Sequence, residues 1–86
     1  MNTYRLVIAS PDGTAFDGEA VMLSLRGAEG DLAILAGHEP FITSVQSGAC
    51  RVQINEQETR EGTIESGLLT VSGEKVMLLS SSFHWT

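Results

Sequence analysis

Two histidines are the residues that chemistry near neutral pH would use first. His38 is followed by Glu39, and His84 lies beside Trp85 near the last residue. A zinc site needs three or four ligands at workable spacing, and the neighbourhood of His38 supplies at most two. We therefore expect His38 to lie in a turn and to pack or hydrogen-bond locally. The alternative hypothesis is a stand-alone β-sandwich metal-binding or enzyme domain centred on His38.

No other pattern in the sequence is typical of a catalytic site. The serines do not lie in a G-x-S-x-G context. The stretch GAEGDLAILAGH has the glycines of a phosphate-binding loop, but it lacks the Lys-Ser/Thr ending, and its Glu29 and Asp31 would repel phosphate. Cys50 alternates with polar neighbours, which predicts a small core residue and not a nucleophile. We expect no catalysis, no metal and no cofactor.

The charge balance excludes several classes of partner. Eleven acidic against five basic residues give a formal net charge of −6, which repels nucleic acid and anionic lipid headgroups. We expect no nucleic-acid binding and no direct lipid insertion. No apolar run approaches the roughly 18 residues of a membrane-spanning helix, and the first residues lack the layout of a signal peptide. Four acids are expected to form one solvated hairpin face: Glu56, Glu58, Glu61 and Glu65.

Short strands are the elements that must position these residues. Apolar and polar residues alternate in 21–26 and in 50–55, as in half-buried strands. Further strands are predicted at 3–9, 32–35, 40–45, 62–66, 68–71 and 75–79. Turn signals separate them, among them Pro11–Gly13, Asp17–Gly18, Gly37–Pro40 and Ser72–Glu74.

The spacing of these strands predicts the fold class. No glycine-free window of ten or more residues has a period of 3.6, so no helix is expected. Strands about 8 to 12 residues apart, with glycine-rich turns, are typical of an antiparallel β-sandwich or flattened barrel. We therefore predict an all-β fold with one domain covering residues 1–86.

The stretch Gly27–Phe41 has the composition of a shaped surface. Its glycines permit tight reversals, and Pro40 directs the chain into the next strand. Glu29 and Asp31 project from a loop, and Phe41 and Ile42 follow at the start of a strand, where an apolar side chain can stay accessible. We interpret this stretch as a binding surface; the alternative is an ordinary irregular connection.

These residues also carry a family resemblance. The run from Phe16 to Val52, followed by Glu65 to Leu79, is similar to the N-terminal β-sandwich domain of the epsilon subunit of F-type ATP synthases, called delta in mitochondria. The pattern that carries it consists of Gly27, Glu29-Gly30, Gly37-His38, Pro40, Gly48 and Gly67. The resemblance implies two antiparallel sheets of about ten strands. It also implies a non-catalytic central-stalk (rotor) subunit that links the gamma subunit to the membrane c-ring and supports coupling of ion transport to ATP synthesis.

The resemblance further implies which residues meet each partner. The acidic loop would face the c-ring through Glu29, Gly30 and Asp31, with contacts that set docking geometry more than affinity. The gamma subunit would be met by Ser10, His38, Pro40, Phe41, Ile42 and Thr43, with Phe41 and Ile42 as apolar anchors. Glu39 places a charge where the family commonly has a small residue, so a more polar contact with gamma is expected.

The end of the sequence is the main departure from the family pattern. Family members usually continue into a C-terminal helical hairpin, whereas this sequence stops at SSSFHWT. We therefore expect no C-terminal helical hairpin and assign neither inhibition of hydrolysis nor ATP binding to these residues. The implied location is that of a peripheral membrane protein on the cytoplasmic face of the bacterial cell membrane. An adaptor for some other partner, using the same loop, is a third hypothesis.

Overall fold

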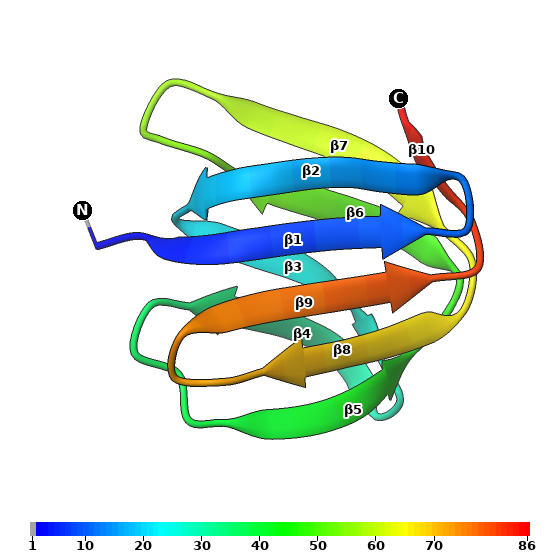
Figure 1. Ribbon diagram of the computed structural model, residues 1–86, viewed down its shortest axis with the longest axis horizontal. Helices are drawn as coiled ribbons and strands as arrows, with labels where there is room; N and C mark the ends of the chain where they lie inside the picture. Colours follow the sequence, from blue (N-terminus) through cyan, green and yellow to red (C-terminus); the bar gives the residue numbers. More distant parts are fainter. Residues whose placement is uncertain (1) are drawn as a thin grey trace.

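The computed structural model describes residues 2–86, which form ten strands and no helix (Figure 1). This confirms the predicted all-β class and the strand number. In chain order the strands are β1 (Tyr4–Ser10), β2 (Gly13–Ala20), β3 (Met22–Gly27), β4 (Gly30–Leu35), β5 (Phe41–Val45), β6 (Gly48–Gln53), β7 (Thr59–Ile64), β8 (Gly67–Val71), β9 (Lys75–Ser80) and β10 (Phe83–Trp85).

The strands form one sheet that folds over into a flattened barrel. The hydrogen-bonded path runs β10-β7-β6-β3-β5-β8-β9-β1-β2, and β4 pairs with β3. In Figure 1 the front layer consists of β2, β1, β9, β8 and β5, and β3, β4 and β6 lie behind it. The two layers therefore enclose a core, as expected for a sandwich.

One strand pair departs from the predicted antiparallel arrangement. β1 and β9 run parallel, with Arg5 opposite Lys75 and Ala9 opposite Leu79, while the other described pairs are antiparallel. Parallel neighbours need a long connection between them, and here nearly the whole chain supplies it. The resemblance and the turn pattern did not predict this pairing.

Two segments were assigned wrongly or missed in the sequence. Asp17 and Gly18 were predicted to form a turn, but they lie inside β2, opposite Val7 and Leu6. The Asp17 carboxylate accepts a hydrogen bond from the Arg5 guanidinium of the neighbouring strand at 3.1 Å. This cross-strand ion pair favours an extended conformation at Asp17. The short strand β10 was not predicted.

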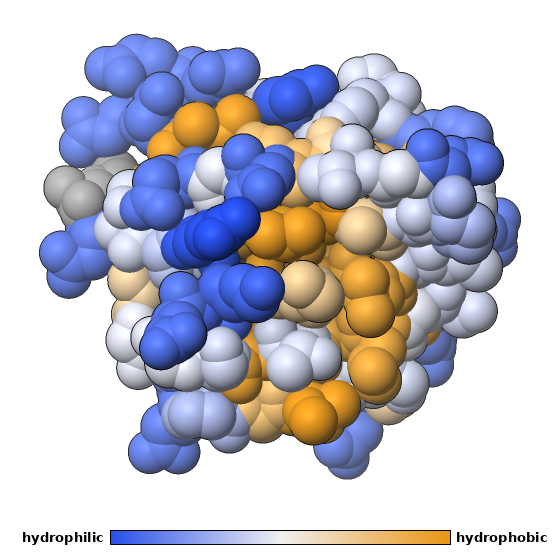
Figure 2. Space-filling view, viewed as in Figure 1, coloured by the Kyte–Doolittle hydropathy of each residue, from blue (hydrophilic) through white to orange (hydrophobic). Residues whose placement is uncertain are grey.

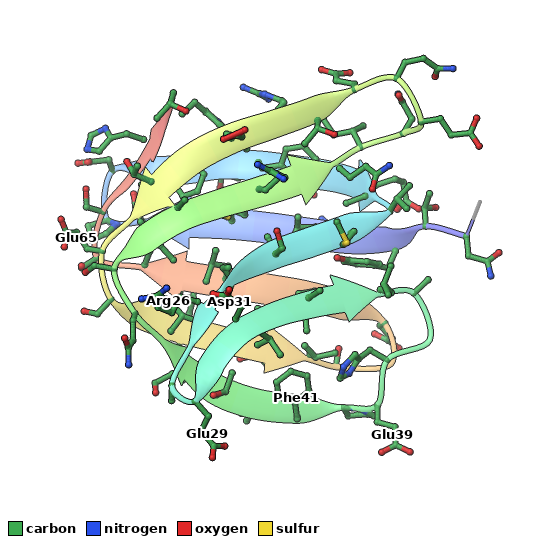
Figure 3. All side chains as sticks on the ribbon, turned by 180° about the vertical axis from the view of Figure 1, so that it is seen from behind. Arg26, Glu29, Asp31, Glu39, Phe41 and Glu65 are labelled. Carbon is green, nitrogen blue, oxygen red and sulfur yellow. The ribbon has the colours of Figure 1, made fainter. Side chains whose placement is uncertain are left out.

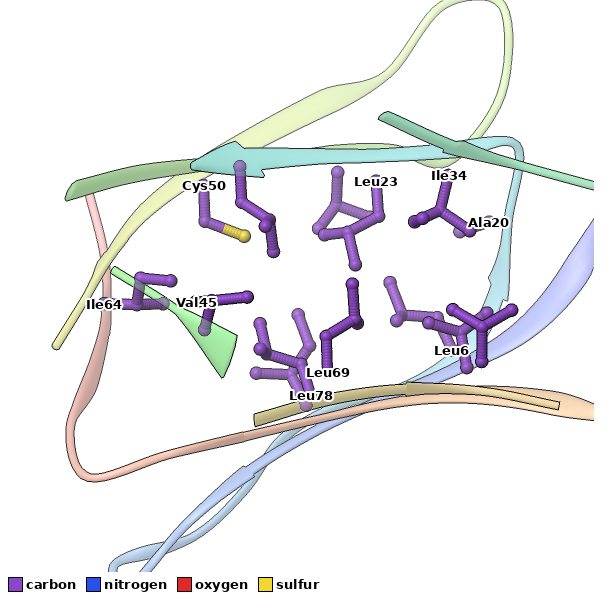
Figure 4. Packing of buried hydrophobic residues seen from close by; sticks show 14 residues of the cluster. Leu6, Ala20, Leu23, Ile34, Val45, Cys50, Ile64, Leu69 and Leu78 are labelled. Carbon is purple, nitrogen blue, oxygen red and sulfur yellow. The ribbon is translucent and has the colours of Figure 1, made fainter. Parts of the chain in front are cut away.

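The core consists of aliphatic side chains from both layers (Figure 4). Cys50 belongs to this core, and burial raises the pKa of its thiol to about 12. The thiol therefore stays protonated near neutral pH, which confirms the structural role predicted for it. The largest fully buried side chains are Leu6, Ile8, Leu23, Ile34, Leu69, Leu78, Val52 and Cys50.

Candidate docking surfaces

The acidic tip, residues Gly27–Asp31, comprises the β3–β4 turn and the strand ends beside it. Asp31 was expected to project from a loop but lies in β4, opposite Arg26. Gly27 pairs with Gly30, which leaves a two-residue loop, and Gly30 has a φ of +129°, a region that favours glycine. Glu29 points into solvent at the end of this hairpin (Figure 3). Asp31 lies 3.7 Å from the guanidinium of Arg26, and both side chains are exposed. Among the described residues, the Asp31 carboxylate is therefore paired with Arg26, whereas the Glu29 carboxylate forms no ion pair.

The four acids predicted to share one hairpin face are all exposed, but they are distributed over the whole length of the sandwich. Glu56 and Glu58 lie in the β6–β7 turn. Glu61 lies in the middle of β7, where its carboxylate forms an ion pair with Arg51 at 3.4 Å. Glu65 follows β7 and lies at the same end of the sandwich as Glu29 (Figure 3). Its carboxylate accepts the Ser47 hydroxyl at 3.0 Å. The acidic end near the tip is therefore larger than the sequence indicated.

His38 lies in an exposed turn between β4 and β5, as predicted. Its backbone N–H donates to Leu35 O at 3.2 Å, its ring Nδ1 lies 3.1 Å from Glu39 O, and its ring packs 5.0 Å from that of Phe41. Within residues 2–86 there is no group of three His, Cys, Asp or Glu side chains placed to hold a metal. The alternative hypothesis of a metal or enzyme site centred on His38 therefore gains no support.

Phe41 and Ile42, the two expected apolar anchors, point to opposite faces of β5. Phe41 is half-buried and packs against the core, whereas Ile42 is 67% exposed on the outer face. Alternation along a strand requires this difference. Thr43 follows on the inner side and is also half-buried, while Pro40 is exposed.

Ser10 lies far from the His38 turn. It ends β1, where its hydroxyl accepts the Asp12 N–H at 3.2 Å. In Figure 1 this end of β1 lies at the right of the front layer, and the β4–β5 turn lies at the left. The residues expected to meet gamma therefore lie at opposite ends of one layer and do not form a compact patch.

An exposed apolar surface lies between these two ends and was not predicted as a site. We call it the outer apolar face; it consists of Ala9, Ile42, Leu68, Met77 and Leu79, together with Val7, which is only 9% exposed. Cross-strand pairing aligns them in two rows, one running from Ile42 through Thr70 and Met77 to Val7, the other from Ser44 through Leu68 and Leu79 to Ala9. Figure 2 shows the resulting apolar area on the front layer.

Three large apolar side chains of this surface are the most exposed to solvent. Ile42, Leu68 and Leu79 are 67%, 42% and 44% exposed. The sequence signal is that LVIA, LLTV and VMLL carry apolar residues at successive positions, so both faces of these strands are apolar. The opposite layer differs: its outer face carries the charged pairs Arg26–Asp31 and Arg51–Glu61 around a shallow groove of about 600 Å³.

Fold and surfaces together define a small β-sandwich that presents one apolar layer and one acidic end, which is typical of a protein-binding module. The family model for the ATP synthase Delta/Epsilon chain, beta-sandwich domain, matches residues 3–86. The chain therefore belongs to the delta/epsilon chain family of ATP synthases, which confirms the resemblance seen in the sequence.

Curated relatives support this assignment. The ATP synthase epsilon chain, sodium ion specific, of Acetobacterium woodii is 34% identical over 83 residues, which cover 96% of this chain and 62% of the relative. The ATP synthase epsilon chain of Caldicellulosiruptor saccharolyticus is 32% identical over 85 residues, which cover 99% of this chain and 61% of the relative. The chain thus spans about 60% of the length of these relatives.

Solved structures support the same fold. A chain of the Euglena gracilis mitochondrial ATP synthase, OSCP/F1/c-ring in rotational state 1, superimposes with a TM-score of 0.90 at 19% identity, over 96% of this chain and 53% of that one. A chain of the Tetrahymena thermophila mitochondrial ATP synthase central stalk/c-ring superimposes with a TM-score of 0.79 at 11% identity. The match covers 95% of this chain and 66% of that one. Residues 2–86 include no helix long and apolar enough to cross a membrane.

Proposed function

We propose that this chain is a non-catalytic subunit of the central stalk of an F-type ATP synthase. In this role it links the gamma subunit to the c-ring and supports coupling of ion transport to ATP synthesis. Its 86 residues act as one domain, peripheral to the membrane on the cytoplasmic face of a bacterial cell. The family membership, relatives named epsilon chain, and neighbours of the same fold in central-stalk and c-ring assemblies support the proposal.

The outer apolar face is the observation that carries the gamma interface. A contiguous apolar patch on a small protein marks a surface that a partner covers. The implied contacts Ser10 and His38 lie at opposite ends of this face, so a subunit touching both would cover the apolar side chains between them. Ile42, Leu68 and Leu79 then act as the anchors, whereas Phe41 contributes mainly by holding β5 in place.

The acidic end carries the c-ring interface in this proposal. Glu29, Gly30 and Asp31 project at one end of the sandwich, and Glu65 lies at that same end. Exposed carboxylates steer and orient docking onto basic or amide groups more than they add affinity. The apolar layer and the acidic end meet two different surfaces, as a linking subunit requires.

The gamma interface is tested by a single charge on the outer apolar face. We expect Leu79→Lys to weaken capture of the gamma subunit by about 10- to 100-fold, because an ammonium would be desolvated in an apolar contact. Ala49→Lys is the matched control, since Ala49 is exposed on the opposite layer. Co-purification with gamma and titration calorimetry measure the difference. Unchanged gamma binding by Leu79→Lys contradicts the proposal, and so does equal loss in both variants.

The ring interface is tested by reversing the acidic tip. Glu29→Lys combined with Asp31→Lys is expected to weaken co-purification of the c-ring and lower ATP-driven ion pumping, while the purified chain stays folded. The fold is expected to survive because these side chains are exposed and the Arg26–Asp31 pair stabilises little. If the doubly substituted variant assembles with the c-ring and supports normal ion pumping, the acidic tip is not part of the ring interface.

A further inference from the structure

In the described part of the flattened barrel, the edges of β4 and β5 face each other without pairing. Among the described residues β4 pairs with β3 alone, and β5 pairs with β8 and meets β3 only where Val45 lies opposite Gly27. A groove of about 350 Å³ separates residues 27–32 from residues 41–43. We call this region the open seam; Figure 3 shows it between the β4 and β5 ribbons.

The register identifies the backbone groups that β4 leaves free. In a two-residue hairpin the closing pair is hydrogen-bonded, and bonded and non-bonded pairs then alternate. Gly30, Leu32 and Ile34 therefore bond to β3, while Asp31, Ala33 and Leu35 direct their N–H and C=O groups toward the open seam. Leu35 O accepts the His38 N–H at 3.2 Å, which agrees with this alternation. The free groups at Asp31 and Ala33 form a template for one more strand.

The side chains around the open seam specify the occupant. Leu32 and Phe41 supply an apolar lining, which suits apolar or β-branched residues in the middle of an extended segment. Glu29 lies near one end of the seam and Glu39 near the other (Figure 3), and neither forms an ion pair among residues 2–86. The six residues of β4 extend over about 20 Å, which a peptide of five or six residues matches.

A second copy of this chain fits the same edge poorly. Antiparallel pairing of two β4 edges would bring Glu29 of one copy toward Glu39 of the other at both ends. Each copy also carries a net charge of −6, which adds repulsion. Charge complementarity therefore favours a segment with lysine or arginine at its ends.

We propose that the free edge of β4 binds an extended peptide segment with basic ends, which adds to the sheet as a further strand. This goes beyond the docking surfaces assigned above, because it adds main-chain groups of β4, although it shares Glu29 and Asp31 with the acidic tip. Its occupant is defined by backbone pairing and charge, whichever partner protein supplies it.

A synthetic peptide tests the site directly on the 86-residue chain. The probe is the hexapeptide Lys-Thr-Val-Thr-Val-Lys with acetylated and amidated ends, titrated into labelled protein and followed by NMR. We expect the amide signals of Asp31 and Ala33 to shift and their hydrogen exchange to slow. A peptide N-methylated at the amide facing Ala33 should bind about tenfold more weakly, since one backbone hydrogen bond is lost. A Glu-flanked peptide should also bind at least about tenfold more weakly.

A protein variant supplies the reciprocal test. Ala33→Pro removes the free N–H without removing a bond to β3, so it should abolish binding, while Ala33→Ser keeps the N–H and should bind normally. If Ala33→Pro does not fold, the N-methylated peptide decides alone. Absence of peptide-induced shifts, equal binding of the N-methylated and parent peptides, or protection of the β4 amides in a peptide-free dimer would each overturn the proposal.

Discussion

The barrel closes differently at its two irregular seams. At the first, the aromatic seam, contacts among β2, β7 and β10 join the two ends of the hydrogen-bonded path. Trp85 Nε1–H donates a hydrogen bond to the main-chain O of Ala15 at 3.1 Å. The Trp85 ring lies edge-on to Phe16 and Phe83, with centroids 6.3 and 4.7 Å away, and the Arg60 guanidinium lies 4.0 Å from its centre. At the open seam, by contrast, β4 and β5 keep free edges. One seam stabilises the fold, and the other leaves backbone groups available for a partner.

Of the substitutions at the two seams, removal of Trp85 should destabilise the fold most strongly. Trp85→Ala loses the hydrogen bond to Ala15 and the contacts with three side chains, so we expect the free energy of unfolding to fall by about 3 kcal/mol. Urea denaturation measures it. Trp85→Phe, which keeps a ring but loses the donor, should cost about 1 kcal/mol. A loss below about 0.5 kcal/mol in Trp85→Ala would mean that β10 does not close this seam.

The packing of β10 against β7 at the aromatic seam can be tested by adding one methyl group at Gly62 of β7. A Cβ at Gly62 would lie 2.8 Å from both His84 O and the Phe83 ring, so Gly62→Ala must displace β10. We expect a cost of about 2 kcal/mol. Gly73→Ala is the control, because nothing lies within 4 Å of its added Cβ. Equal thermal midpoints for both variants would contradict tight packing of β10.

The open seam is predicted to depend on Phe41 more modestly. Phe41→Ala should lower the free energy of unfolding by about 1.5 kcal/mol, because the ring is only partly buried against the core. Its neighbour Ile42 points outward, so Ile42→Ala should change stability by less than about 0.5 kcal/mol. Denaturant titration of the pair measures the contrast. Similar losses would show that the two faces of β5 are not distinct.

The smallest effect is expected at the tip beside the open seam. Arg26→Gln removes the exposed 3.7 Å pair with Asp31, and we expect a change below about 0.5 kcal/mol. A double-mutant cycle with Asp31→Asn, repeated at high salt, isolates the pair. A coupling energy above about 1 kcal/mol would give the tip a stabilising role that its exposure does not predict.

Much of the fold could be predicted from local patterns. Alternation of apolar and polar residues located most strands and the core position of Cys50, because burial on one face imposes a period of two. The parallel β1–β9 pairing could not be found this way, since residues from the two ends of the chain form it. β10 is only three residues long and follows a run of serines, so its pattern was too short to detect.

The candidate surfaces were predictable in part. The turns on either side of β4 were correctly predicted, because glycines and a proline punctuate the stretch Gly27–Phe41. Phe41 and Ile42 were both expected to act as accessible apolar anchors, although alternation alone puts neighbouring side chains on opposite faces. The outer apolar face needed the pairing of four strands before its residues came together, and the free edge of β4 depends on which strand does not pair.

The parallel contact between β1 and β9 has a consequence for synthesis of the chain. β1 emerges from the ribosome well before β9, because about 70 residues separate Arg5 from its neighbour Lys75. At roughly 5 to 20 residues per second, that delay lasts several seconds. During this time the β1–β2 hairpin has an unpaired edge and apolar residues on both faces. Completion of the barrel therefore depends on β9, which is made long after β1, and this predicts slow folding dominated by long-range contacts.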